Sequence, residues 1–147
     1  MSIDDDVALF QSVPTLRLLG SAALRVLAIG SEQREFQRGE ILFHRDDEAD
    51  AGFVVRRGAF RLEDGASTEI IAGPRALMGE LAMVVPVKRR STATALERSS
   101  VIRIPRSLFQ RVLEADPAAA RRLRDEFIVR SGQITDDLKS ATAKLNR

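Results

Sequence analysis

The chain of 147 residues contains no cysteine, no tryptophan and no tyrosine, and it has a single histidine. Without cysteine there is no disulfide framework, no thiolate metal site and no cysteine nucleophile. The histidine, His44, has no cysteine or second histidine near it in the sequence, so we expect no zinc site. The acidic residues between Asp46 and Asp50 lack the spacing and the central glycine of an EF-hand, so we expect a solvated loop without bound calcium.

Long apolar runs and a strong net charge are also missing. No apolar segment approaches the roughly 20 residues that a membrane span requires, and the N-terminus (Met1–Asp6) is acidic where a secretory signal would be basic. We therefore expect no membrane association and a cytoplasmic location. The formal charge of +2 is too small to indicate a nucleic-acid-binding protein. Arginines cluster at 121–124, but the chain leaves no room for a helix-turn-helix after its last helix, so direct DNA binding is not expected.

Patterns typical of catalysis are scarce. A hydrolase needs a nucleophile beside a general base, but Ser91 has no histidine near it in the sequence and no Gly-x-Ser-x-Gly motif occurs. The sequence therefore predicts a binding protein and not an enzyme.

What is present fits one domain with three segments. With 44% hydrophobic and 30% charged residues the chain can form a single core. Residues 1–33 have helical periodicity, residues 34–104 read as strands, and residues 105–147 become helical again.

Two helices are expected in the first segment. One covers Val7–Gln11, and a stronger one begins after an N-cap at Ser21 and stops at Gly30. The apolar face of the second helix consists of Ala23, Leu24, Leu27 and Ala28.

Short apolar or alternating stretches in the middle segment predict strands. They are Ile41–Phe43, Phe53–Val55, Phe60–Leu62, Ile70–Ala72, Thr92–Ala95 and Val101–Ile104. Turn dipeptides separate them at Arg38-Gly39, Arg57-Gly58, Asp64-Gly65 and Gly73-Pro74. This spacing is typical of an antiparallel barrel or sandwich, so the expected class is α+β and mainly β.

A long helix closes the chain. After a helical face formed by Leu108, Phe109, Val112 and Leu113, Asp116 as N-cap and Pro117 as first residue start a helix that can run to Arg147. Steps of four and three produce a heptad seam at Phe127, Ser131, Ile134, Leu138, Ala141 and Leu145. The seam either packs on the chain's own barrel or pairs with a second copy in a homodimer, and the sequence leaves both open.

The most informative segment is Gly79–Ala95, which we call the phosphate cassette. It begins with Gly-Glu-Leu-Ala-Met, a tight turn into a short helix whose free N–H groups at Gly79, Leu81 and Ala82 can hold an anion. Lys88, Arg89 and Arg90 follow just before a strand, so at least one guanidinium can point to the same anion.

Glu80 has a different role because a carboxylate next to a phosphate would repel it. A carboxylate accepts hydrogen bonds, which suits the hydroxyl groups of a ribose. Glu80 and an arginine at two ends of one site therefore describe a ribose joined to a phosphate, which is a nucleotide.

These residues resemble the cyclic nucleotide-binding domain family. Its cassette is similar to Gly-Glu-Leu-Ala-Leu, several variable residues, and Pro-Arg-x-Ala-Thr-Val-x-Ala, so that Arg89 falls at the family's arginine and Glu80 at its ribose carboxylate. Gln37–Phe43, Arg57–Leu62 and Ile104–Phe109 resemble the family's turns and its junction between barrel and helix. The resemblance implies an eight-stranded jelly-roll barrel flanked by N-terminal helices and a long C-terminal helix.

Departures from the family surround the phosphate ligand. Lys88 replaces a proline, and Arg90 stands where the family often has Ala, Ser or Thr. A slip of one residue would make Arg90 the phosphate ligand with Ser91 beside it, but burial of one strand face favours Arg89. Asp46 and Arg75 occupy positions where glycine is common, and Asp tolerates left-handed geometry better than most residues.

The base of the nucleotide has fewer expected contacts. The resemblance implies that the last helix covers the base, where Thr135 can offer a hydroxyl group to adenine and Arg130 can lie over a purine. The ligand is cAMP or cGMP, with cAMP slightly favoured.

The resulting hypothesis is a cyclic nucleotide sensor without other cofactors, which relays binding through its C-terminal helix to a homodimer partner or an effector protein. The alternative is a degenerate domain that keeps the fold, binds no nucleotide and serves as a dimerisation or docking module. A third reading makes the chain one part of a larger regulator or channel, and the N-terminal Met1 favours the stand-alone protein.

Overall fold

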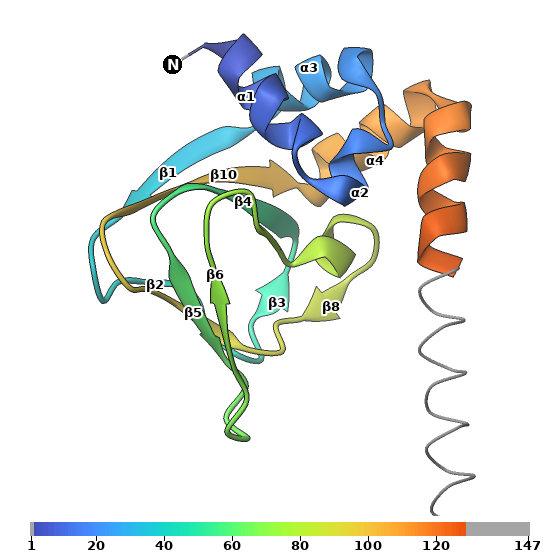
Figure 1. Cartoon of the computed structure of the whole chain (residues 1–147). Coiled ribbons are helices and arrows are strands. Elements are labelled where there is room, and N and C mark those ends of the chain that lie inside the picture. Colours follow the sequence, from blue (N-terminus) through green and yellow to red (C-terminus); the bar gives the residue numbers. More distant parts are fainter. Residues whose placement is uncertain (1, 129–147) are drawn as a thin grey trace, which may run out of the picture.

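A computed structural model describes residues 2–128 of the chain (Figure 1). It consists of a β-roll with helices gathered at one end, and a further helix, residues 117–128, that runs down beside the roll. The labelled helices are α1 (Ile3–Gln11), α2 (Pro14–Arg17), α3 (Ser21–Gly30), the short 3-10 helix η1 (Glu80–Met83) and α4 (Arg106–Ala115). The predicted α+β class with flanking helices is confirmed.

The strands pair in an antiparallel manner. Their bounds are β1 (Glu32–Phe36), β2 (Ile41–Phe43), β3 (Glu48–Ala49), β4 (Ala51–Arg57), β5 (Phe60–Glu63), β6 (Glu69–Ala72), β7 (Leu77–Met78), β8 (Val87–Lys88), β9 (Thr92–Ala95) and β10 (Ser99–Pro105). One sheet has the order β1-β10-β4-β7, a second has β2-β9-β5-β6, and β3 pairs with β8.

Residues 2–128 therefore contain ten strands where eight were expected. The difference comes from very short pieces, since β3, β7 and β8 have two residues each. One break lies at Asp50 between β3 and β4, where the carbonyl accepts the N–H of Arg106 at 2.7 Å. All six segments predicted as strands coincide with or lie inside observed strands.

The helix starts differ from the sequence expectation in two places. Helix α1 begins at Ile3, ahead of the predicted Val7, because Ser2 and Asp5 form a reciprocal capping box with bonds of 3.1 and 3.4 Å. The N-cap of α3 is Gly20, with φ of 85°, and Ser21 is the first helical residue, so the prediction of Ser21 as N-cap was wrong. Gly20 reaches this left-handed φ without the steric cost of a side chain.

Two non-glycine residues adopt a left-handed conformation at positions where the resembling family often has glycine. Asp46 has φ of 73° and Arg75 has φ of 76°. Backbone bonds fix both turns: Asp46 donates its N–H to the carbonyl of Arg89, and Arg75 donates to that of Val55, each at 2.8 Å. These bonds offset the conformational strain of a non-glycine residue at positive φ.

Two apolar clusters form the core. The first lies between the helices and the outer face of β4 and β10, and it includes Phe10, Leu24 and Phe109. It also contains the whole predicted apolar face of α3. The second cluster fills the β-roll around Phe53 and Phe60. The phosphate cassette spans both clusters, since Met83 belongs to the first and Ala93 to the second.

Helix 117–128 starts as predicted. The Asp116 carboxylate accepts the N–H of Ala119 at 3.1 Å, which is the bond expected of an N-cap. Leu123 is buried and Phe127 packs against the first cluster. Phe127, the first member of the predicted heptad seam, therefore contacts its own domain, and the later members lie outside the described residues. No helix within residues 2–128 is both long and apolar enough to cross a membrane.

Replacing Asp116 by alanine should lower the free energy of unfolding by about 0.5–2 kcal/mol, because the buried N–H of Ala119 loses its acceptor. Urea denaturation measures this change. Asp116→Asn keeps a capping oxygen and should lose much less. An equal loss for both variants would show that the capping oxygen is not what stabilises the start of this helix.

Candidate functional site

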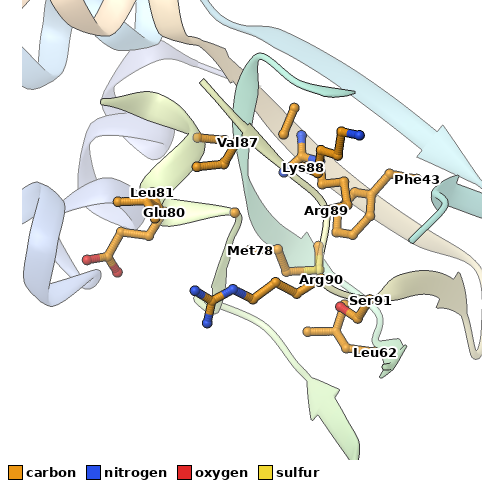
Figure 2. A pocket seen from close by; sticks show the side chains of 13 residues that line it. Phe43, Leu62, Met78, Glu80, Leu81, Val87, Lys88, Arg89, Arg90 and Ser91 are labelled. Carbon is orange, nitrogen blue, oxygen red and sulfur yellow. The ribbon is translucent and has the colours of Figure 1, made fainter. Parts of the chain in front are cut away.

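The phosphate cassette encloses a cavity of about 310 Å³ on the side of the β-roll (Figure 2). Its walls come from η1, from the stretch that joins β8 to β9, and from side chains of β2 and β5. The lining residues are Phe43, Ala49, Leu62, Met78, Gly79, Glu80, Leu81, Ala82, Val87, Lys88, Arg89, Arg90 and Ser91. The structure thus brings together every predicted ligand residue that it describes.

Gly79 makes the turn that opens the cassette. Its backbone has φ of 74° and ψ of 38°, a left-handed conformation that favours glycine, and η1 starts at the next residue. The N–H of Ala82 donates to the carbonyl of Gly79 at 3.1 Å. This amide, which the sequence suggested as an anion ligand, is engaged within the turn, whereas Ala82 as a residue still lines the cavity.

Arg89 is the buried cation of the site, with 7% of its surface exposed. Its Nη2 donates to the carbonyl of Ala51 at 2.8 Å. The guanidinium carbon lies 4.4 Å from the ring centre of Phe43 and 5.4 Å from that of Phe53, within cation–π range. Two strands, β2 and β4, therefore hold the side chain in place.

The second terminal nitrogen of Arg89 differs from the first in its hydrogen bonding. Nη1 is buried and makes no hydrogen bond to any of residues 2–128. It faces Gly79 so closely that a Cβ atom on that glycine would lie only 2.2 Å from it. A buried guanidinium nitrogen without an acceptor is costly, and an anionic ligand at this place would supply the missing acceptor.

The electrostatics around Arg89 lead to the same conclusion. Burial lowers the pKa of the Arg89 guanidinium below the ordinary arginine value, and the carboxylates of Asp50 and Asp47 offset part of this shift. Neither carboxylate is within salt-bridge distance of Arg89 in the described residues. The cation is thus desolvated without a close counter-charge, an arrangement that an anion stabilises.

The neighbours of Arg89 are arranged differently. Arg90 is exposed on the cavity wall and has no hydrogen-bond or ion-pair partner among the described residues. In Figure 2 its side chain extends away from Arg89, on the side of Met78. Lys88 lies on β8, opposite Glu48 of β3, and Ser91 is half-buried. Of the two arginines, only Arg89 is buried and fixed by the fold.

Glu80 is the first residue of η1 and is half-buried at the edge of the cavity. Figure 2 shows it on the other side of the view from Arg89 and Ser91. The carboxylate and the buried guanidinium thus lie apart along the lining of the cavity.

Several residues of the site were not predicted from the sequence. Phe43 and Phe53 were assigned to strands without a role, and Ala51 carries no chemical signal at all. All three contact the Arg89 guanidinium. Leu62 and Met78 add apolar wall from β5 and β7. Thr135 and Arg130, the residues predicted to contact the base, lie outside the described residues.

The acidic loop and the histidine show no metal-binding arrangement. His44 Nδ1 lies 3.7 Å from a carboxylate oxygen of Asp47, and both side chains are exposed. Within residues 2–128 no group of three or more His, Cys, Asp or Glu side chains is placed to hold a metal ion.

Comparison with known proteins identifies the family to which the chain belongs. The model of the cyclic nucleotide-binding domain family matches residues 33–116, more than half of the chain. Among curated proteins, the HTH-type transcriptional regulator Cmr of Mycobacterium tuberculosis is 30% identical over 112 residues. These cover 70% of this chain, and the chain spans 46% of the length of that regulator.

Solved structures are similar over most of the chain. A cyclic nucleotide-binding-like protein from Brucella abortus is 32% identical, with a TM-score of 0.66 over 75% of this chain and 98% of that one. The N-terminal domain of a transcriptional regulator from Streptomyces coelicolor is 25% identical, with a TM-score of 0.79 over 88% of this chain and 94% of that one.

Proposed function

Because the chain belongs to the cyclic nucleotide-binding domain family, we propose that it is a sensor that binds cAMP or cGMP in the cassette cavity and catalyses no reaction. One observation carries the proposal: the buried Nη1 of Arg89 has no hydrogen-bond partner among residues 2–128 and faces Gly79 at the cavity wall. The singly charged cyclic phosphate is an acceptor of suitable size and sign for this nitrogen. Glu80, on the other side of the cavity, accepts from the ribose hydroxyl.

Binding energy in this arrangement comes from a guanidinium that is already desolvated and oriented. The rings of Phe43 and Phe53 and the carbonyl of Ala51 fix the Arg89 side chain before the ligand arrives. Less side-chain entropy is lost on binding, and the phosphate meets a cation in a medium of low dielectric constant. Apolar contacts from Leu62 and Met78 suit the faces of the sugar and the base.

The signal leaves the site through a shift between conformations that already exist. Bound nucleotide favours the state in which the cassette closes on the phosphate, and the C-terminal helix follows. The output is a change in how this helix is presented to a second copy or to an effector protein. The names of the related regulators, one of them an HTH-type protein, support a role in signalling.

Calorimetric titration of cAMP and of cGMP into the full chain tests the proposal. At a hundredfold excess over Kd the ligand should raise the free energy of unfolding by about 2.7 kcal/mol, visible as a higher Tm. Absence of both heat and thermal shift at millimolar concentrations of either nucleotide would reject the sensor and favour the degenerate docking module.

A further inference from the structure

Arg106 is the first residue of α4, a position where the dipole of the helix disfavours a positive charge. The N-cap is Pro105, which offers no side-chain cap, and the first turn has no acidic residue. A cation at a helix N-terminus is unfavourable with respect to the helix dipole. Arg106 therefore needs a stabilising contact elsewhere in the fold.

That contact is made with the phosphate cassette. A single nitrogen, Nη1 of Arg106, lies 3.0 Å from the carbonyl oxygen of Ala49, 3.3 Å from that of Ala82 and 3.3 Å from that of Val85. Ala82 lies in η1, and Val85 follows its end. The carbonyl groups at the end of a helix carry partial negative charge, which favours a cation. One guanidinium thus joins α4 to the cassette.

The same short segment also holds the phosphate-binding arginine. Three consecutive carbonyls, at 49–51, accept hydrogen bonds from two arginines. The side chain of Arg106 donates to the carbonyl of Ala49, and its backbone N–H donates to that of Asp50 at 2.7 Å. The side chain of Arg89 donates to the carbonyl of Ala51 at 2.8 Å. A movement of Arg89 toward a ligand therefore acts on the backbone to which α4 is tied.

We propose that Arg106 is a positioning residue that couples occupancy of the cassette cavity to the orientation of α4. This inference rests on the proposed nucleotide binding. Ligand contacts bias η1 from its Gly79 end, and Arg106 holds the carbonyls at the other end. When η1 shifts, the guanidinium and the start of α4 shift with it. Helix 117–128 follows α4 directly, so the movement reaches the C-terminal helix.

The alternative is that Arg106 is only a structural clamp whose loss lowers stability without changing the signal. Hydrogen exchange on the unmodified chain separates the two. Coupling predicts that saturating cAMP or cGMP changes amide exchange both in residues 79–85 and in residues 103–110. Protection confined to residues 79–85 would overturn the coupling.

Variants test the guanidinium itself. The chain has no cysteine, so Glu114→Cys places a single thiol for a fluorescent label on the exposed side of α4. In this labelled chain, Arg106→Met removes the charge and keeps a side chain of similar length. Arg106→Lys keeps a cation with three donors for the three carbonyls. Arg111→Met is the control, because it removes an exposed arginine from the same helix.

Coupling between sites typically changes affinity by a factor of about 5–150. We expect about tenfold weaker nucleotide binding for Arg106→Met, together with loss of most of the label response at saturation. Arg106→Lys and Arg111→Met should keep the response. A full response of Arg106→Met at saturating nucleotide would overturn the proposal. If neither nucleotide binds the unmodified chain, the proposed function fails as well; binding without any response at α4 removes only the coupling.

Discussion

Replacement of Arg89 by methionine should weaken the binding of cAMP and cGMP by roughly 30- to 1,000-fold, since removing one partner of a buried charge pair costs about 2–4 kcal/mol. The expectation follows from burial. Only 7% of the surface of Arg89 is exposed to water, and its Nη1, which has no partner within the described part of the chain, lies beside Gly79. No other described cation of the cavity is buried, because Lys88 and Arg90 are exposed.

Arg89→Met should change the stability of the unliganded protein far less than it changes the affinity for nucleotide. Methionine loses the bond to Ala51 and the cation–π contacts, but it also removes a buried nitrogen for which residues 2–128 provide no acceptor. A flexible thioether still packs against the rings of Phe43 and Phe53. We therefore expect the free energy of unfolding without ligand to change by only about 1 kcal/mol, since these effects oppose one another.

Two measurements check the Arg89 prediction: calorimetric titration, and Tm with and without saturating nucleotide. Arg90→Met is the matched control, because it removes an adjacent but exposed arginine. Its affinity should fall by less than about tenfold, in keeping with the small contribution of exposed charges. The reverse result, with Arg89→Met binding normally and Arg90→Met not binding, would place the phosphate on Arg90.

Gly79→Ala should damage both the fold of the cassette and its affinity. An alanine in the left-handed conformation of Gly79 costs about 1–2 kcal/mol. In addition its Cβ would lie 2.2 Å from Nη1 of Arg89, so the guanidinium must move. If it leaves the carbonyl of Ala51, that acceptor becomes unsatisfied, which costs about 1–3 kcal/mol. Nucleotide binding should become undetectable by calorimetry.

Gly73→Ala is the control for a generic loss of glycine. Gly73 has open space at the position of a Cβ, and its φ lies outside the left-handed region. Its unfolding midpoint in urea and its affinity should stay close to those of the parent chain. If Gly79→Ala bound nucleotide as tightly as Gly73→Ala, the close approach of Gly79 and Arg89 would have no part in the site.

Much of the β-roll followed from local rules. The turn glycines Gly39, Gly58 and Gly65 all have positive φ, as turn dipeptides between short apolar segments predict. The two-residue strands were not predicted, because a pair of residues carries no periodicity and forms a strand only when a distant partner supplies the ladder. This is the case for β8, which pairs with β3 from far earlier in the chain.

The helix ends show the same division. Asp116 was correctly predicted as an N-cap because its partner, Ala119, is three residues away. Ser21 was not, since the choice between Gly20 and Ser21 depends on how the chain arrives from α2. The early start of α1 was readable in principle from the Ser2–Asp5 capping box.

The sequence by itself determined the order of the charged groups along the cassette: a carboxylate at Glu80 after a glycine turn, then a run of cations before β9. Only the tertiary structure decided that Arg89 is buried and that Arg90 is not. Both arginines line the cavity in the bend between β8 and β9, so their position in the chain does not decide which of them is buried. Arg89 is buried because Phe43, Phe53 and Ala51 contact its guanidinium from β2 and β4. These contacts join residues far apart in the sequence, so no local pattern predicts them.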